Sequence, residues 1–231
     1  MSESRLIVER DGPIGVMAFD NPTRRNAISG VMWRAIPQAM AEFDADPEIR
    51  CVILRGEGTA AFAAGADISE FEKRRASEDS IKEYEGTVEA AQHALEGSRK
   101  PVIALIHGFC IGGGVEMALA CDLRYAGASS QFAIPAARLG IGYGVHGTNR
   151  LVATVGHAAA REIMFTGGRY DAEQALAMGL VIACCRMPSS TLTCASSRSS
   201  LRSTRRCRWP LRKRSSMPSS ARAAISRAAN R

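Results

Sequence analysis

The sequence lacks the marks of membrane-bound and secreted proteins. It contains no run of about 18 or more apolar residues, so we expect no membrane-spanning helix. Its first residues, MSESRLIVERDG, do not combine a basic region with an apolar core, and we therefore expect no secretory signal peptide. Together these absences predict a cytoplasmic protein that does not contact a membrane.

The seven cysteines form no known pattern. Their spacing matches no zinc-binding motif, and their odd number argues against a disulfide framework. Cys51, Cys110 and Cys121 lie within apolar segments, where a free thiol behaves as a small hydrophobic group. We therefore expect no metal site and a reducing environment.

Acidic residues are absent from the end of the chain. Residues Arg186 to Arg231 hold twelve basic residues and twelve serines, so this part carries +12 and the preceding residues carry −5 of the net +7. It has no sustained helical or strand period, and we expect it to be disordered. One interpretation is a basic arm for nucleic acid or a membrane. We favour a shift of reading frame near Val181, because the composition changes within an element and not in a polar linker.

The rest of the chain has an ordinary globular composition, long enough to bury a sizeable core. Alternating residues around Asp11-Gly12 predict a hairpin. Helical spacing covers Ser29–Phe43, with Ser29 as the N-cap, and Ser80–Leu95, and short helical pieces separated by glycines follow Gly147. The predicted buried strands are CVILRG, PVIALIHG, LRYAG and QFAIP. Strands that alternate with helices predict an α/β fold with a largely parallel sheet.

Two segments share one order of strand, glycine-rich turn and helix: VILRGEGTAAFAAGADISEF and PVIALIHGFCIGGGVEMALA. Each turn leaves unpaired N–H groups at the start of a helix, where the helix dipole is positive. Glycine also lets a ligand approach the backbone closely. Two such N–H groups that converge on one oxygen form an oxyanion hole. The second segment carries Glu116 on an apolar helix, where burial should raise its pKa toward the range that suits acid–base catalysis.

Four motifs carry a resemblance to a known family: NPTRRNAIS, FAAGADISEF, HGFCIGGGVEMALACDLRYA and FTGGRYDAEQALAMGLV. In order and spacing they resemble the crotonase (enoyl-CoA hydratase/isomerase) superfamily over about residues 5–182. The resemblance implies a crotonase (ClpP-like) fold of repeated β-β-α turns and an acyl-CoA substrate. It also implies a homotrimer or hexamer. We therefore divide the chain into an acyl-CoA-binding core, 1–182, and an atypical tail, 183–231.

The resemblance implies roles for single residues. The N–H groups of Ala66 and Gly113 would bind the thioester oxygen, and Glu116 would position and activate water. Arg24 and Arg25 would contact the phosphates of coenzyme A, although an exposed surface turn is the alternative for this pair. For Glu116 the alternative is a structural acid that caps nearby backbone. The remaining substrate-binding residues implied by the motifs are Ala64, Gly65, Asp67, Ile68 and Gly112.

The sequence departs from the family's hydratases at one position. They carry a second glutamate just after a proline in the segment that follows CDLRYAG, and here that position is Ala136. Tyr143 and His146 are candidates nearby, and LGIGY resembles a tyrosine motif of some decarboxylases in the superfamily. For each of them a packing or surface role is the alternative.

We predict a hydratase-like lyase that acts through an enolate and needs no cofactor, since coenzyme A is part of the substrate. Decarboxylation or isomerisation on the same scaffold remains open, as does a catalytically inactive CoA- or RNA-binding protein. We do not expect a nucleic-acid partner. The glycines of GYGVHG match a dinucleotide-binding spacing, but they do not follow a strand, so we exclude a Rossmann site.

Overall fold

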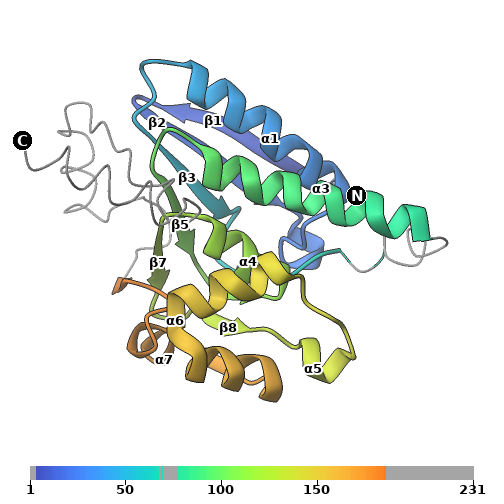
Figure 1. Ribbon diagram of the computed structural model, residues 1–231. Coiled ribbons are helices and arrows are strands. Elements are labelled where there is room, and N and C mark those ends of the chain that lie inside the picture. The colour runs from blue at the N-terminus through green and yellow to red at the C-terminus, as the bar shows by residue number, and fades with distance from the viewer. Residues whose placement is uncertain (1–3, 68, 70–77, 186–231) are drawn as a thin grey trace, which may run out of the picture.

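The computed structural model describes residues 4–67, 69 and 78–185 (Figure 1). Its larger sheet has six strands in the order β1-β2-β3-β5-β7-β10. All neighbouring strands in it are parallel except β1 and β2, which form the hairpin predicted around Asp11-Gly12. The strands are β1 (Arg5–Asp11), β2 (Ile14–Asp20), β3 (Cys51–Gly56), β5 (Val102–Ile106), β7 (Leu123–Gly127) and β10 (Ala183–Cys185).

A smaller sheet has four strands in the order β4-β6-β8-β9. They are β4 (Ala61–Ala63), β6 (Phe109–Ile111), β8 (Gln131–Ala133) and β9 (Arg169–Asp171). Three strands of the larger sheet are each followed by a strand of the smaller one: β3 by β4, β5 by β6 and β7 by β8. A helix comes after each pair, so the chain repeats the predicted β-β-α unit and its predicted α/β class is confirmed.

The helices bring distant parts of the chain together. They are α1 (Gly30–Ala45), α3 (Glu78–Gly97), α4 (Gly113–Ala120), α5 (Ala136–Leu139), α6 (Val145–Thr166) and α7 (Ala172–Ala177), with a 3-10 turn at Pro22–Arg24. Figure 1 shows α1 and α3 side by side, with α4 and α6 nearer to the smaller sheet. Because α4 contacts both α3 and α6, side chains from three segments meet around α4.

Local signals explain where several elements begin and end. The hydroxyl of Ser29 accepts a hydrogen bond from the Met32 N–H at 3.4 Å, as the predicted N-cap of α1. The first two short pieces predicted after Gly147 are joined in α6, which kinks at Gly156, a residue with φ of 78°, and the third is the separate helix α7. Strands β4 and β6 were not predicted, because three residues are too few to show an alternating pattern.

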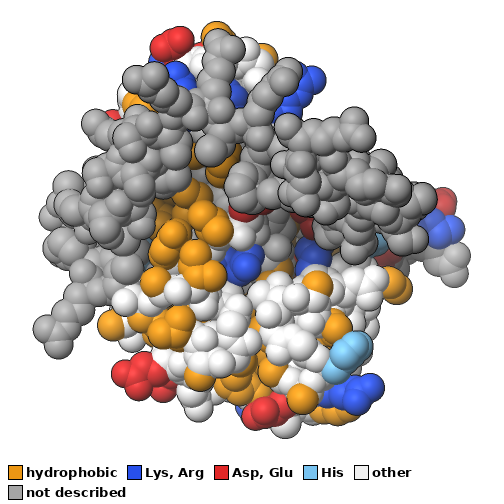
Figure 2. Space-filling view, turned by 60° about the vertical axis from the view of Figure 1, so that its left-hand side comes forward, with side chains coloured by type: hydrophobic (Ala, Val, Ile, Leu, Met, Phe, Trp, Pro, Cys, Tyr) orange, Lys and Arg blue, Asp and Glu red, His pale blue; other side chains and the backbone are white. Residues whose placement is uncertain are grey.

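The core lies on both faces of the larger sheet. Alternate residues such as Phe19 and Leu54 belong to the large cluster that also holds Trp33 and other residues of the helices. Their neighbours, such as Val16 and Ile53, form a smaller cluster on the opposite face. Figure 2 turns the left-hand side of Figure 1 toward the viewer. Hydrophobic side chains gather on the side of the molecule that this view shows.

The larger sheet ends within the segment assigned to the tail. Strand β10 pairs in parallel with β7, so Ala183–Cys185 continue the sheet. The predicted disorder of residues 186–231 lies outside the described residues, as does the predicted contact of Ile68 with the substrate. No helix in the part of the chain that the structure describes has the length and hydropathy needed to cross a membrane.

Candidate functional site

The two glycine-rich turns meet in space although they are almost 50 residues apart in the sequence. A Cβ atom built on Gly113, the first residue of α4, would lie 3.5 Å from the backbone nitrogen of Ala66. The same atom would lie 3.6 Å from the Cζ2 atom of Trp33. The parallel arrangement of β4 and β6 produces this contact, because it aligns the segments that follow the two strands.

Both turns present a free N–H group at this point. Ile28 donates its N–H to the carbonyl of Gly65 at 2.8 Å and accepts from the N–H of Asp67 at 3.0 Å. In such a parallel bridge the intervening residue, Ala66, directs its own N–H away from Ile28. The Gly113 N–H lies in the first turn of α4, where the helix offers no acceptor. Among the hydrogen bonds of the described residues, neither N–H has an acceptor.

Each glycine of the triplet meets a different requirement. Gly112 has φ of 52° and ψ of −115°, a conformation that other residues rarely adopt, and its N–H donates to the Ala133 carbonyl at 2.8 Å. Gly113 leaves space in front of the Ala66 peptide. A Cβ atom on Gly114 would lie 2.5 Å from the carbonyl oxygen of Ala63, so only glycine lets α4 approach β4 this closely.

A cavity of about 720 Å³ opens over the two turns. Its wall comes from both turns, from α3, from the start of α4 and from the segment 135–147. Most of the site residues predicted from the sequence line it: Ala64, Gly65, Ala66, Asp67, Gly112, Gly113, Glu116 and Tyr143. Arg24 and Arg25 are not among the lining residues.

Glu116 projects from the first turn of α4 into this cavity. Burial raises the pKa of its carboxyl group, while the charge of Arg150 and a hydrogen bond from Gln92 partly oppose that shift. The Gln92 amide nitrogen lies 3.3 Å from Oε2 of Glu116. A Cβ atom on Gly147 would lie 2.7 Å from Oε1, so this glycine leaves room for the carboxyl group. Glu116 is therefore a desolvated acid in the wall of the same cavity as the Ala66 and Gly113 N–H groups.

The raised pKa of Glu116 predicts a pH-dependent stability difference. Folding favours the neutral acid, so the stability that this group contributes is full below its ordinary pKa of 4.5 and is lost as the pH rises through the raised value. Glutamine stays neutral at every pH. We expect Glu116→Gln to match the wild-type chain below about pH 4 and to become the more stable protein as the pH increases, measured as urea midpoints at a series of pH values. A wild-type chain that is more stable than the variant at pH 7 would contradict this assignment.

The position of the missing second acid lies at the same cavity. Ala136 is buried and begins α5, and its methyl group cannot transfer a proton. The Tyr143 hydroxyl would lie 3.7 Å from a Cβ atom on Gly112. Burial raises the pKa of Tyr143, and the nearby carboxylate of Glu116 raises it further, so its phenol stays protonated at neutral pH.

Helix α3 contributes acids that sequence reasoning missed. Glu85 and Glu89 line the cavity, one helical turn apart from each other and on the same side as Gln92. Their spacing along an amphipathic helix could have indicated a shared face, but only the packing of α3 against α4 shows which site that face meets. His146 lines the cavity too, and its ring packs edge-on against His93 of α3, with 5.7 Å between ring centroids.

The two predicted phosphate-binding arginines make contacts within the chain. Arg24 forms an ion pair with Asp67 at 2.6 Å, and Arg25 lies over the ring of Phe109 at 4.8 Å. Burial alone would raise the pKa of Asp67, but hydrogen bonds from Ser69 and the charge of Arg24 outweigh it and lower the pKa. Asp67 is thus an ionised anchor directly after Ala66. Both arginines remain exposed at the surface.

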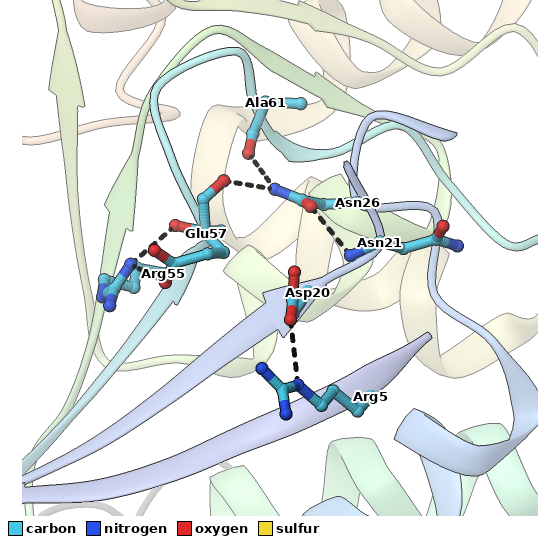
Figure 3. Close-up of polar contacts among 8 residues, drawn as sticks. Arg5, Asp20, Asn21, Asn26, Arg55, Glu57 and Ala61 are labelled. Atoms are coloured by element: carbon cyan, nitrogen blue, oxygen red, sulfur yellow. Dashed lines mark hydrogen bonds and ion pairs between the residues drawn. The ribbon is translucent and has the colours of Figure 1, made fainter. Parts of the chain in front are cut away.

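The turn that carries these arginines is held by Asn26 (Figure 3). Its amide nitrogen donates to the carbonyls of Glu57 and Ala61, at 2.9 and 2.8 Å. Asn26 and Arg25 both have positive φ, which asparagine tolerates better than most residues. The Ala64 N–H donates to the Arg25 carbonyl at 3.0 Å, so this turn also supports the start of the Ala66 turn.

Other kinds of site find little support in the described part of the chain. No group of three or more His, Cys, Asp or Glu residues that could hold a metal ion occurs there. The GYGVHG segment follows α5 and not a strand, unlike the glycine motif of a Rossmann site.

The fold and the cavity define a class of α/β proteins built from repeated β-β-α units, with two converging turns and a carboxylic acid at one site. Residues 9–194 match the enoyl-CoA hydratase/isomerase family. The chain belongs to this family, and it is an enzyme. The predicted superfamily and its crotonase fold are therefore confirmed.

Known relatives match most of the described chain. A short-chain-enoyl-CoA hydratase of Clostridium acetobutylicum is 35% identical over 78% of this chain and 69% of its own length. A crotonyl-CoA hydratase of Syntrophomonas wolfei is 33% identical over 78% of this chain and 69% of its own length. The crystal structure of an enoyl-CoA hydratase/carnithine racemase from Magnetospirillum magneticum has a TM-score of 0.80 and 34% identity, over 87% of this chain and 74% of that one.

Proposed function

We propose that this protein adds water across the double bond of a 2-enoyl-CoA thioester, as a hydratase. The observation that carries the proposal is the meeting of the Ala66 and Gly113 N–H groups at the cavity that also receives Glu116. Hydration beside a thioester passes through an enolate, whose negative oxygen needs fixed hydrogen-bond donors. The names of the Clostridium and Syntrophomonas relatives support the same reaction and a short acyl chain.

In this mechanism the thioester oxygen accepts hydrogen bonds from Ala66 and Gly113. Each donor contributes about 3–4 kcal/mol to transition-state stabilisation in comparable sites. The Glu116 carboxylate removes a proton from water as the water oxygen bonds to the β-carbon, and the electrons of the double bond move to the thioester oxygen. The resulting Glu116 carboxylic acid then returns the proton to the α-carbon as the enolate collapses. One carboxyl group thus serves as base and as acid, which its raised pKa suits.

The same scaffold supports a second candidate, decarboxylation of a malonyl-type CoA ester. Ala136 stands where a hydratase would carry its second acid, and the protonated Tyr143 hydroxyl points toward the Gly112 turn. A phenol that keeps its proton can donate a hydrogen bond to a substrate carboxylate. Loss of carbon dioxide would leave the same enolate in the same oxyanion hole.

Binding of coenzyme A also belongs to the proposal. We infer that Arg24 and Arg25, exposed beside the Ala66 turn, attract its phosphates. The reaction needs no cofactor besides the coenzyme A that the substrate carries. We further propose a homotrimer or hexamer in the cytoplasm, as the crotonase resemblance implies.

Turnover assays on the full chain distinguish the two reactions. We expect crotonyl-CoA to lose the ultraviolet absorbance of its conjugated thioester, and Tyr143→Phe to reduce that rate by less than about tenfold, because a hydrogen-bonding group outside the proton path makes a small contribution. Release of carbon dioxide from malonyl-CoA that Tyr143→Phe abolishes would favour decarboxylation instead. Absence of turnover with either ester, together with salt-sensitive RNA binding, would overturn both candidates.

A further inference from the structure

Glu116 does not stand alone in the cavity wall; a buried side chain of α3 holds its carboxyl group. Gln92 is only 4% exposed. Its amide nitrogen donates to Glu116 Oε2 at 3.3 Å, and its amide oxygen accepts a hydrogen bond from Nη1 of Arg150 at 2.7 Å. The chain of contacts therefore runs from α4 through α3 to α6.

Arg150 is fixed from its other side. Its guanidinium group forms a two-point ion pair with Glu96, in which Nη2 lies 2.9 Å from Oε2 and Nε contacts Oε1. The Arg150 side chain is 12% exposed. Such a two-point contact fixes the orientation of the planar guanidinium as well as its distance. Glu96 thus anchors Arg150 so that one nitrogen faces Gln92.

The chemistry of these groups allows only one arrangement. Arginine has donors and no acceptor, so the oxygen of the Gln92 amide must face Arg150. The NH₂ group of Gln92 must then face Glu116. An amide that could rotate freely would offer either its donor or its acceptor to the carboxyl group, and Arg150 removes that freedom. Gln92 on α3 and Arg150 on α6 thus set the orientation of the Glu116 carboxyl group, although both are far from Glu116 in the sequence.

We propose that Gln92 and Arg150 act as one positioning pair, which orients the carboxyl group of Glu116 for proton transfer at the substrate. This inference rests on the proposed function insofar as Glu116 is the acid–base group. Neither residue need contact the reacting atoms. The pair places a hydrogen-bond donor on Oε2, while Oε1 lies beside Gly147 in the wall of the cavity.

The charge of Arg150 has a second consequence. Burial raises the pKa of Glu116, and the positive charge of Arg150 limits that rise. The carboxyl group can therefore both take a proton from water and give one to the substrate. Other titratable groups share the wall of the cavity with this carboxyl group: Asp67, Glu85, Glu89, Tyr143 and His146. Arg150 is distinguished among the groups around Glu116 by a direct hydrogen bond to the amide that holds the acid.

The test uses Gln92→Leu, Arg150→Met and the double variant, with two readings. Hydration of crotonyl-CoA should fall about ten- to a hundredfold in each single variant, mainly in kcat, because a misplaced acid loses efficiency while binding is retained. The pKa of Glu116, followed by NMR of ¹³C-labelled glutamate and assigned by its absence in Glu116→Gln, should rise in both. If the two residues act as one unit, the double variant should be no slower than the slower single variant.

Arg161→Met is the matched control, because Arg161 is an exposed arginine of the same helix and should leave both readings unchanged. Arg150→Lys keeps the charge without the planar two-point contact, so it should restore the Glu116 pKa more fully than kcat. Unchanged kcat and pKa in folded Gln92→Leu and Arg150→Met, or effects that multiply in the double variant, would overturn the positioning pair. A wild-type chain without turnover would overturn the proposed function instead, while the NMR titration would still report on the pair.

Discussion

Replacement of Glu116 by glutamine should lower the rate of crotonyl-CoA hydration by about 10³-fold, within the range that general acid–base groups contribute. Glutamine has nearly the same shape and can still accept the hydrogen bond of Gln92, but it cannot take a proton from water or return one to carbon. The loss should appear in kcat, since the oxyanion donors and the cavity wall are unchanged. Steady-state kinetics with crotonyl-CoA measure it directly.

The control for this experiment is the same chemical change outside the cavity. Glu162 is exposed on α6, and Glu162→Gln should keep wild-type kinetics. The expected gain in stability of Glu116→Gln at neutral pH separates a catalytic loss from misfolding. If Glu116→Gln retained more than about a tenth of the activity, Glu116 would not be the acid–base group. Glu89 and Glu85, which also line the cavity, would then be the next residues to substitute.

Replacement of Gly113 by alanine should strongly reduce catalysis while the fold is retained. Its φ is not positive, so alanine fits the backbone, and the added methyl group would lie at an ordinary contact distance of 3.5 Å from the Ala66 nitrogen. That methyl group would compete with a thioester oxygen for the space between the two N–H groups. We expect kcat/KM to fall by about 10²–10³, comparable to the loss of one oxyanion donor.

Thermal unfolding distinguishes this effect from damage to the structure. Gly113→Ala should unfold at or above the wild-type temperature, because alanine favours helix over glycine by up to about 1 kcal/mol. Gly86→Ala is the matched control: Gly86 is exposed in α3 with no atom near its added Cβ, and it should alter stability alone. Full activity in Gly113→Ala would show that the thioester oxygen does not bind between Ala66 and Gly113.

Local patterns predicted much of the secondary structure, because the forces behind them act over a few residues. The turn at Asp11-Gly12 and the side-chain cap of Ser29 depend only on their neighbours, and both occur as predicted. The two strand–turn–helix segments were also predicted, and their glycines indicated bare backbone at a helix start. Of the smaller sheet only β8 was predicted, within QFAIP; β4, β6 and β9 were missed, since strands of three residues carry too little pattern.

Contacts between distant side chains could not be predicted in the same way. The motif that contains Arg24 predicted phosphate binding but gave no sign of its ion pair with Asp67, 43 positions away. Gln92 belongs to a polar helix with no motif of its own. The hydrogen bond of Gln92 to Glu116 depends on how α3 packs against α4. The apolar periodicity of α3 alone does not predict that packing.

The sequence alone indicated the family and, through its resemblance, the repeated β-β-α architecture, and it singled out Glu116 as the candidate acid, because these features reside in motifs and in short-range backbone preferences. Only the tertiary structure decided that the Ala66 and Gly113 peptides face one another and that Gln92 and Arg150 hold Glu116. The physical reason is distance along the chain: a catalytic arrangement is made by parallel strands and packed helices, which bring together groups that no local pattern connects.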